Sequence, residues 1–282
     1  MATLLTQLSD SISGATASAA ASIVRIDGAR RSSATGIAWS SDLVITAAHV
    51  VRARDGISIA REDGQSFAAT IVGGDSGTDV ALLRAEGAQL KPIGWSDREP
   101  RVGHLVLVAG RPGRTLRTSL GLISAAAGEW RTHDGSRIDR YIDVDASLPR
   151  GFSGGPLLDS EGAAIGLNTS GVTRGGTTIP HATVNRVVDE LQQHGSIRRP
   201  LLGVGVYPVE EGLLVMSVKD GSGAANAGIR VGDIIRTIGA EEVRSPRKLH
   251  AILMNGAVGN EIEVELLRGG EKRNVRVAVG AA

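Results

Sequence analysis

The residues best suited to chemistry in this chain are one serine, one histidine and one aspartate. Ser153 lies in the segment GFSGGP at 151–156, where a sharp glycine-rich turn can bring backbone N–H groups beside its hydroxyl. A serine hydroxyl is a weak nucleophile unless a general base takes its proton and a carboxylate orients that base. His49 ends one apolar run and Asp79 begins another. We therefore predict that Ser153 is a nucleophile, His49 its base and Asp79 the orienting acceptor.

Each of these residues also has an ordinary structural interpretation. A chain with 38 glycines can hold a serine in a simple turn, a lone histidine at a strand end is often structural, and Asp79 could cap a turn. The order His49, Asp79, Ser153 is that of a chymotrypsin-type triad, which favours chemistry. A nucleophile elbow also fits Gly-x-Ser-x-Gly, but it requires a helix after the serine, whereas 157–167 is typical of strand, turn and strand.

Short strands separated by turn pairs are predicted to position these residues. From residue 22 to about 179, apolar or alternating runs are divided by Asp-Gly and Gly-Gly pairs, which supply the positive φ that hairpins need. The predicted strands are 22–26, 36–39, 43–46, 56–60, 68–72, 80–84, 104–109 and 138–144. Many short strands at this spacing indicate an antiparallel barrel or sandwich.

The pattern changes at His181, where apolar residues at helical spacing predict one amphipathic helix that ends at Gly195. Beyond it, a smaller unit has strands at 203–206 and 213–218, a helix that Ser245 caps, and a hairpin that turns at 269–270. The predicted organisation is a partly helical N-terminal segment at 1–21, a first domain at 22–195, a linker at 196–200 and a second domain at 201–282.

Composition excludes several classes of function. The 282 residues suffice for one large or two ordinary domains, and a net charge of +1 predicts no nucleic-acid partner. The absence of cysteine excludes disulfides, thiolate zinc sites and iron–sulfur clusters, and the predicted chemistry needs no metal or other cofactor. No apolar run reaches the 18 or so residues of a membrane helix. The first 30 residues do not resemble a secretory signal, so we expect a cytoplasmic location for the chain as written, or an extracytoplasmic one if a leader was removed.

Three motifs together resemble the catalytic motifs of the trypsin-like serine proteases: TAAH at 46–49, DVALL at 79–83 and GFSGGPL at 151–157. The DVALL pattern, the missing cysteines and the appended small domain narrow the resemblance to the HtrA/Deg family. This resemblance implies a mostly β fold, with a chymotrypsin-like double β-barrel followed by a small PDZ domain, a β-sandwich with helices. It also implies an endopeptidase that cleaves unfolded or exposed polypeptides through an acyl-enzyme.

The resemblance extends to the rest of the active site. The backbone N–H groups of Gly151 and Ser153 would form the oxyanion hole. The pocket for the substrate residue on the acyl side of the cleaved bond, P1, would lie among Ser147, Leu167, Asn168, Thr169 and Ser170. Ser147 would be at or near its base, and because no acid stands there we expect a small or medium apolar P1 residue rather than lysine or arginine.

Two departures from the family pattern leave an alternative open. Phe152 replaces the usual asparagine before the serine, and Arg150 replaces the usual proline before the first oxyanion glycine. If these residues misplace the loop, the chain would be a proteolytically silent chaperone or adaptor that binds partners through its PDZ domain. The family also implies a homotrimer, although the aromatic residues that often hold it together are absent before Trp39.

The second domain resembles a PDZ domain, in which a loop binds the carboxylate of a C-terminal peptide tail. That loop would be Leu201, Leu202, Gly203 and Val204, and Leu249 and Leu253 would line the apolar groove beside it. Gly-x-Gly at 221–223 could instead begin a dinucleotide-binding loop. Asn226 stands where that motif requires glycine or alanine and no βαβ pattern follows, so we disfavour this alternative.

Overall fold

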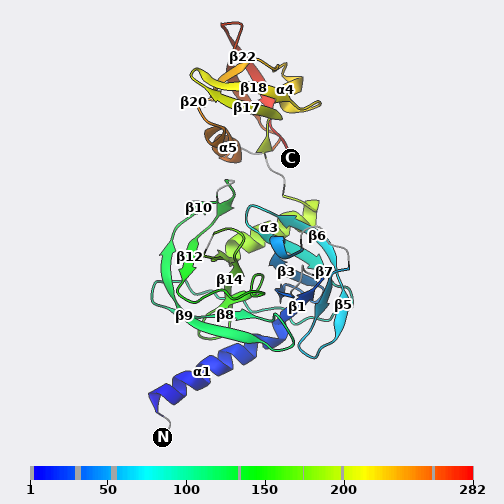
Figure 1. Cartoon of the computed structure of the whole chain (residues 1–282), viewed down its shortest axis with the longest axis vertical. Helices are drawn as coiled ribbons and strands as arrows, with labels where there is room; N and C mark the ends of the chain where they lie inside the picture. Colours follow the sequence, from blue (N-terminus) through cyan, green and yellow to red (C-terminus); the bar gives the residue numbers. More distant parts are fainter. Residues whose placement is uncertain are drawn as a thin grey trace. The chain divides into compact units, whose positions relative to one another are not determined.

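A computed structural model of the chain describes residues 3–28, 33–51, 56–132, 135–173, 175–197, 200–255 and 258–281. The chain forms two compact units, Met1–Ile197 and Arg198–Ala282, each with its own core (Figure 1). Among the described helices, none combines the length and the apolar character that crossing a membrane requires.

The first sheet of the first unit is antiparallel and curls back on itself. Its strands are β1 (Ile23–Asp27), β2 (Ala34–Ala38), β3 (Leu43–Ala47), β4 (Ser58–Ala60), β5 (Ser66–Ala68), β6 (Thr70–Asp75) and β7 (Val80–Arg84). They are ordered β5-β4-β1-β2-β3-β7-β6. Since β5 and β6 lie at opposite ends of this order but are separated by one residue in the chain, the sheet approaches a closed barrel.

The second sheet contributes the other half of the unit. Its strands are β8 (Leu105–Gly110), β9 (Arg117–Ala127), β12 (Tyr141–Val144), β13 (Pro156–Leu158), β14 (Ala164–Thr169) and β15 (Thr177–Pro180), ordered β12-β9-β8-β13-β14-β15. The Thr177 hydroxyl donates to the Ile142 carbonyl at 3.3 Å, so the two end strands also meet. A separate pair is formed by β10 (Trp130–Arg131) and β11 (Arg137–Ile138).

The protease-type half of the fold prediction is confirmed, with local corrections. The predicted strand 68–72 runs across the break at Ala69 between β5 and β6. The predicted strand 138–144 is divided between β11 and β12. Strand β9 has no counterpart among the predicted strands: most of its residues are partly or fully exposed, and Gly121 and Ser124 interrupt its apolar residues. The helix α3 (His181–His194) ends at Gly195 as predicted, with φ of +70°.

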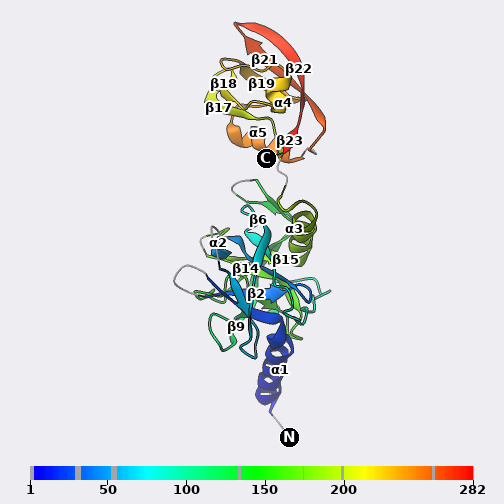
Figure 2. The ribbon, with the colours of Figure 1, turned by 90° about the vertical axis from the view of Figure 1, so that its right-hand side faces the viewer.

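Helix α1 (Leu4–Ala19) extends from the first unit and joins the 3-10 turn η1 (Ala20–Ser22) before β1 (Figures 1 and 2). Its first turns are exposed, whereas Ala15 and Ala19 are buried in the main core. The buried guanidinium of Arg111 holds this junction: Nη2 donates to the Ala20 carbonyl at 2.9 Å and Nε to the Ile23 carbonyl at 2.7 Å.

We expect Arg111→Met to lower the free energy of unfolding by about 2–4 kcal/mol, because two buried carbonyl groups lose a charged donor. Burial lowers the pKa of Arg111, and the Glu62 carboxylate at 3.7 Å opposes that shift. Urea unfolding of the full chain measures the loss, with the exposed Arg114→Met as the matched control. Lysine has a single ammonium group and cannot donate to both carbonyls in the same geometry, so Arg111→Lys should also be less stable than wild type. Equal stability of Arg111→Lys and wild type would contradict this explanation.

The second unit is an antiparallel sheet covered by helices. Its strands are β16 (Pro200–Leu201), β17 (Val204–Val209), β18 (Gly212–Val218), β19 (Ile234–Ile238), β20 (Glu241–Glu242), β21 (Glu261–Arg268), β22 (Glu271–Ala278) and β23 (Gly280–Ala281); its helices are α4 (Gly223–Asn226) and α5 (Pro246–Asn255). The main order is β17-β18-β19-β21-β22, which leaves β17 at one edge. Because the pairings are antiparallel and Ser222 merely caps the short α4, no dinucleotide-type βαβ unit is present in the described part of this unit.

An ion pair with a buried carboxylate connects the turn before β19 to the end of β21 in the second unit. Asp233 is 1% exposed and receives two hydrogen bonds from Arg268, Nε to Oδ1 at 2.8 Å and Nη2 to Oδ2 at 2.7 Å. The Arg230 backbone N–H also donates to Oδ2, at 2.8 Å. Burial alone would raise the pKa of Asp233, but the hydrogen bonds from Arg268 and Arg230 outweigh it and lower that pKa.

The stability of the second unit should therefore fall in acid. A carboxyl group whose folded pKa is below its unfolded value of about 3.9 stabilises the fold above that pH, and this contribution disappears as pH falls through the folded pKa. We expect Asp233→Asn to destabilise the unit by about 2–4 kcal/mol at pH 7 and to flatten its pH dependence below about pH 4. Scanning calorimetry of the full chain tests this, with the exposed Asp220→Asn as control; an unchanged acid slope in Asp233→Asn would refute it.

Candidate active site

Strand register brings His49 to Asp79. Strands β3 and β7 are antiparallel, with Ala47 opposite Val80, so the residues after β3 lie beside the residue before β7. His49 is in the short helix α2 (Ala48–Val51) that follows β3. Its Nδ1 lies 2.6 Å from Asp79 Oδ2, and its backbone N–H donates to Asp79 Oδ1 at 2.8 Å. Both carboxylate oxygens therefore hold the histidine.

Asp79 is held rigidly and is almost fully buried. Its side chain is 4% exposed, against 38% for the His49 side chain. The Thr169 hydroxyl donates to Asp79 Oδ2, and Gly171 leaves no room for a side chain, since a Cβ there would stand 2.2 Å from the same oxygen. The turn before β7 is capped by Asp75, which accepts from the Thr78 N–H at 3.0 Å. Asp79 is thus not the cap of that turn and is available to His49.

Ser153 is the second residue of a tight turn, 152–155, that directly follows another tight turn, 149–152. The Phe152 N–H donates to the Pro149 carbonyl at 3.1 Å, and the Gly155 N–H donates to the Phe152 carbonyl at 2.9 Å. Gly154 must be glycine: its φ is +90°, and a Cβ would meet the Thr35 carbonyl oxygen at 2.1 Å. Strand β13 follows, so the strand-to-helix elbow is absent.

The turn before the serine leaves two N–H groups available. Gly151 has φ of +87° at the third position of the Pro149–Phe152 turn, as a type II turn requires. The Gly151 carbonyl accepts from the buried Thr35 hydroxyl at 2.6 Å. Within the residues that the structure describes, neither the Gly151 N–H nor the Ser153 N–H donates to another protein group. Both are therefore available to a ligand oxygen.

The segment 110–112 packs against this turn and helps to hold Thr35, which bonds to it. A Cβ at Gly110 would contact the Phe152 ring at 2.7 Å, and the Arg111 N–H donates to the Thr35 hydroxyl at 2.8 Å. Phe152 is 2% exposed within a cluster of buried apolar side chains. Phe152, one of the two departures from the family pattern, therefore anchors the turn in the core of the second sheet.

The Ser153 hydroxyl contacts Ser170 rather than His49. The two hydroxyl oxygens are 3.1 Å apart, and the Ser170 N–H donates to Ser153 Oγ at 3.3 Å. No hydrogen bond joins Ser153 to His49 among the described residues.

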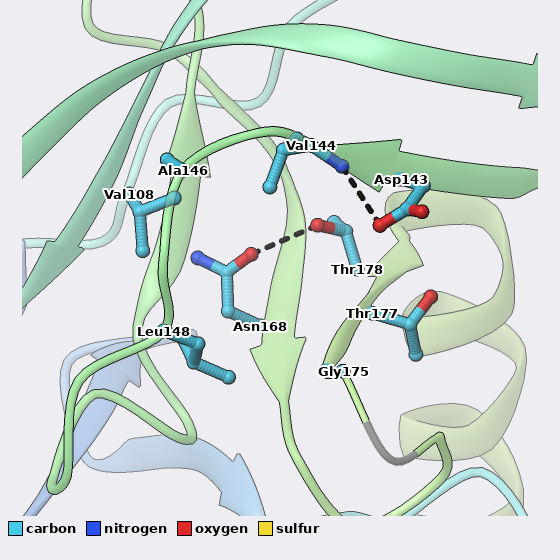
Figure 3. Close-up of a pocket in the computed structure, with 10 residues that line it drawn as sticks. Val108, Asp143, Val144, Ala146, Leu148, Asn168, Gly175, Thr177 and Thr178 are labelled. Carbon is cyan, nitrogen blue, oxygen red and sulfur yellow. Dashed lines mark hydrogen bonds between the residues drawn. The ribbon is translucent and has the colours of Figure 1, made fainter.

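Residues of β8, β12, β14 and β15 enclose a small cavity of about 20 Å³ (Figure 3). We call it the Asn168 cavity; it is lined by Val108, Asp143, Val144, Ala146, Leu148, Asn168, Gly175, Gly176, Thr177 and Thr178. Leu148 directly precedes the Pro149–Phe152 turn. The Gly154 N–H donates to the Asn168 carbonyl, and the Asn168 N–H donates to the Gly155 carbonyl, both at 2.8 Å. These bonds place the cavity next to Ser153.

The residues predicted to line one pocket have different surroundings in the structure. Asn168 lines the cavity, but Leu167 belongs to the main core and Thr169 contacts Asp79, because successive residues of β14 face opposite sides. Ser170 contacts the serine hydroxyl. Ser147 is exposed, while its neighbours Ala146 and Leu148 line the cavity.

The predicted carboxylate loop of the second unit joins β16 to β17. Gly203 has φ of +85°. The Leu202 carbonyl accepts from the Ala224 N–H of α4 and the Gly203 carbonyl from the Lys219 N–H. In the described residues, the N–H groups of Leu202 and Gly203 have no protein acceptor. Strand β17 has one open edge and contacts α5. Leu249 and Leu253 of α5 are 7% and 6% exposed in the core of this unit.

Sequence reasoning missed Thr35 and Arg111 as supports of the site. The available signals were weak: Thr35 is the polar residue near the start of the entirely buried strand β2, and Arg111 is a charge directly after β8. Their partners are distant in sequence, and Thr35 and Gly151 are 116 positions apart. Such contacts are visible only in the folded chain.

Comparison with known families matches both units. Residues 34–167 match the model of the trypsin-like peptidase domain, and residues 200–279 match the model of the PDZ domain.

Relatives and solved structures agree with these matches. The chain is 33% identical over 272 residues to a probable periplasmic serine endoprotease, DegP-like, of Halomonas elongata, covering 89% of this chain and 57% of that protein. A serine endoprotease structure from Yersinia pestis has a TM-score of 0.73 at 29% identity and covers 96% of this chain and 98% of its own. The HtrA-type protease AlgW with a decapeptide has a TM-score of 0.72 at 25% identity, covering 96% of this chain and 98% of its own.

The chain spans little more than half the length of the curated relatives that it matches first. The solved structures are matched over nearly their whole length, through both units in the same order. A trypsin-like peptidase domain followed by a PDZ domain, in a chain whose relatives carry DegP and HtrA names, shows that this protein belongs to the HtrA/Deg family of serine proteases.

Proposed function

We propose that the chain is a serine endopeptidase that cleaves unfolded or exposed polypeptides. The observation that carries this proposal is the arrangement around Ser153: a histidine held by a buried carboxylate on one side, and two unengaged backbone N–H groups on the other. The endoprotease names of the relatives support the same reaction.

In the acylation step, Ser153 Oγ attacks the carbonyl carbon of the substrate while its proton passes to His49 Nε2. Asp79 accepts at Nδ1, so Nδ1 carries the imidazole proton and Nε2 presents its lone pair. The Gly151 and Ser153 N–H groups donate to the oxygen that gains negative charge. The C–N bond then breaks, and His49 returns the proton to the leaving amine.

In deacylation, water takes the place of the amine. His49 removes a proton from water as its oxygen bonds to the acyl carbon, and the proton then returns to Ser153 Oγ as the ester bond breaks. The oxyanion N–H groups serve both steps. The chain's own side chains supply every proton transfer in this cycle.

The second unit binds the C-terminal tails of polypeptides in this proposal. The unengaged N–H groups of Leu202 and Gly203 suit a carboxylate, and the open edge of β17 beside α5 suits an added strand. Leu249 and Leu253 form the apolar floor of that groove. Binding there recruits substrates for protein quality control or regulates their cleavage.

Digestion of an unfolded fluorescent casein at neutral pH tests the proposed reaction. Wild type should release peptides and Ser153→Ala should release none, while a fluorophosphonate probe should label wild type alone. Hydrolysis that persists in Ser153→Ala would remove the nucleophile from the proposal. Failure of wild type to cleave or become labelled would favour the silent adaptor, which the core position of Phe152 and the names of the relatives do not favour.

A homotrimer is the proposed assembly. Its support in this chain is the exposed apolar end of α1, where Leu4 is 81%, Leu5 77% and Leu8 41% exposed. Light scattering of wild type and of a variant with these three leucines changed to serine measures the assembly. A monomer in the wild type would reject the trimer.

A further inference from the structure

Arg150, the other departure from the family pattern, has no structural partner. It occupies the second position of the Pro149–Phe152 turn, where a type II turn has a negative φ and proline is common. Its side chain is exposed and makes no hydrogen bond or ion pair with the residues that the structure describes. The turn therefore does not require this arginine, and its charge is available to a ligand.

Most other described arginines of the first unit lie beside a carboxylate. Arg25, for example, is 2.7 Å from Asp27. In the described part of this unit, the exposed Arg114 and Arg117 resemble Arg150 in having no ion pair. We call these three residues, Arg114, Arg117 and Arg150, the arginine rim. Their charges are not neutralised within the chain.

The arginine rim lies in two segments that meet at the Pro149–Phe152 turn. Segment 110–117 reads GRPGRTLR and segment 149–152 reads PRGF, so neither contains an acidic residue. A Cβ at Gly151 would stand 2.6 Å from Pro112, which shows how closely the two segments pack. The N–H that Gly151 offers to the substrate oxygen belongs to the peptide group that links Gly151 to Arg150. The Arg150 side chain therefore begins beside the reacting carbonyl group.

Two carboxylates that adjoin this turn are engaged elsewhere. Asp27 accepts from the hydroxyl of Ser33, whose carbonyl approaches the turn, at 2.7 Å, and it also pairs with Arg25. Asp145 precedes the turn in the chain and accepts from the Leu122 N–H at 2.6 Å. Neither carboxylate pairs with the arginine rim, so the positive charge faces solvent at the place where a substrate must pass.

Resting on the proposed endopeptidase function, we infer that Arg150 selects acidic polypeptide segments, with Arg114 and Arg117 adding to the positive field. A substrate whose carbonyl oxygen accepts from the Gly151 N–H passes within reach of the Arg150 guanidinium. Because an extended chain rises about 3.3 Å per residue, the long arginine side chain reaches an aspartate or glutamate within about three residues of the cleaved bond. A carboxylate there gains a charged, two-pronged partner that a neutral residue cannot use.

Quenched peptides that carry glutamate or glutamine at one of the three positions on either side of the cleaved bond test this inference. The two residues have the same shape, so their ratio of kcat/KM isolates the charge, and mass spectrometry verifies that the same bond is cut. At the most sensitive position, wild type should favour glutamate about 5-fold in low salt and less than about 2-fold in about 0.5 M salt, where screening shortens the range of the field. Equal rates at every position, or a preference for glutamine, would overturn the inference.

Variants connect the preference to the guanidinium. Arg150→Gln should abolish the preference for glutamate while the glutamine peptide is cleaved at nearly the wild-type rate, and Arg150→Lys should keep part of the preference. Lys91→Gln removes the same charge from an exposed position outside both segments and should leave the ratio unchanged. Should Arg150→Gln not fold, Arg150→Pro serves in its place, because proline suits this position of the turn. A wild-type ratio retained in the folded variant would refute the role of Arg150.

Binding separates this inference from the proposed reaction. The same peptides, amidated at the C-terminus so that a carboxylate loop cannot recognise them, are titrated by fluorescence anisotropy against Ser153→Ala, with and without Arg150→Gln. Tighter binding of the glutamate peptide that requires Arg150 supports the inference even if wild type hydrolyses nothing, in which case only the proposed function fails. Equal binding of the two peptides, or a preference that persists without Arg150, removes the inference and, with normal casein cleavage, leaves the function standing.

Discussion

Asp79→Asn should lower kcat about 10⁴-fold while the chain keeps its fold. The His49 backbone N–H donates to Asp79 Oδ1, so the amide oxygen of the variant side chain will accept that bond. The amide NH₂ group will then face His49 Nδ1. An NH₂ donor there requires Nδ1 to accept, which moves the imidazole proton to Nε2. A protonated Nε2 cannot take the proton of Ser153. Single-turnover hydrolysis of a peptide ester measures the loss.

The matched control for this variant is Asp75→Asn. Asp75 is 4% exposed and lies four positions earlier, where it caps the turn instead of contacting His49. Asparagine caps turns as well, so kcat should stay within a few-fold of wild type. If Asp79→Asn were no slower than Asp75→Asn, Asp79 would not set the histidine tautomer.

Thr35→Val should lower kcat about 100-fold with little change in KM, the second large effect. Valine keeps the shape of the side chain but removes the hydroxyl that donates to the Gly151 carbonyl and accepts from the Arg111 N–H. The peptide that follows Gly151 then loses its anchor, and the Gly151 and Ser153 N–H groups are no longer held on one oxygen. Because these groups stabilise charge in the transition state, kcat falls more than substrate affinity.

Thr183→Val separates this positioning role from general stability. Thr183 is likewise fully buried and its hydroxyl also makes a short bond, to Asp139 Oδ2 at 2.6 Å, but it lies in α3 away from the serine turn. Both variants should lose about 1–3 kcal/mol of unfolding free energy. Only Thr35→Val should lower kcat while leaving KM nearly unchanged. A similar fall in kcat in Thr183→Val would show that the effect comes from lost stability.

The amino-acid sequence determined the chemistry through local patterns. The order of His49, Asp79 and Ser153, and glycines at positions of positive φ, are properties of short segments that can be recognised in an unfolded chain. The alternation of strands and turns also predicted the mostly β fold and the position of the second unit. Strand β9 was missed because Gly121 and Ser124 interrupt its apolar residues, and because most of its side chains are partly or fully exposed, so it carries little of the burial signal on which such predictions depend.

Only the tertiary structure decided which neighbouring residues share a face and which distant ones meet. Four consecutive residues of the 167–170 segment were assigned to one pocket, yet the folded strand directs Leu167 to the core, Asn168 to the cavity and Thr169 to Asp79. The hydrogen bond from Thr35 to Gly151 spans 116 positions and joins the first sheet to the turn before Ser153. Contacts of this kind depend on strand register and packing, which the whole chain determines together and no local motif records.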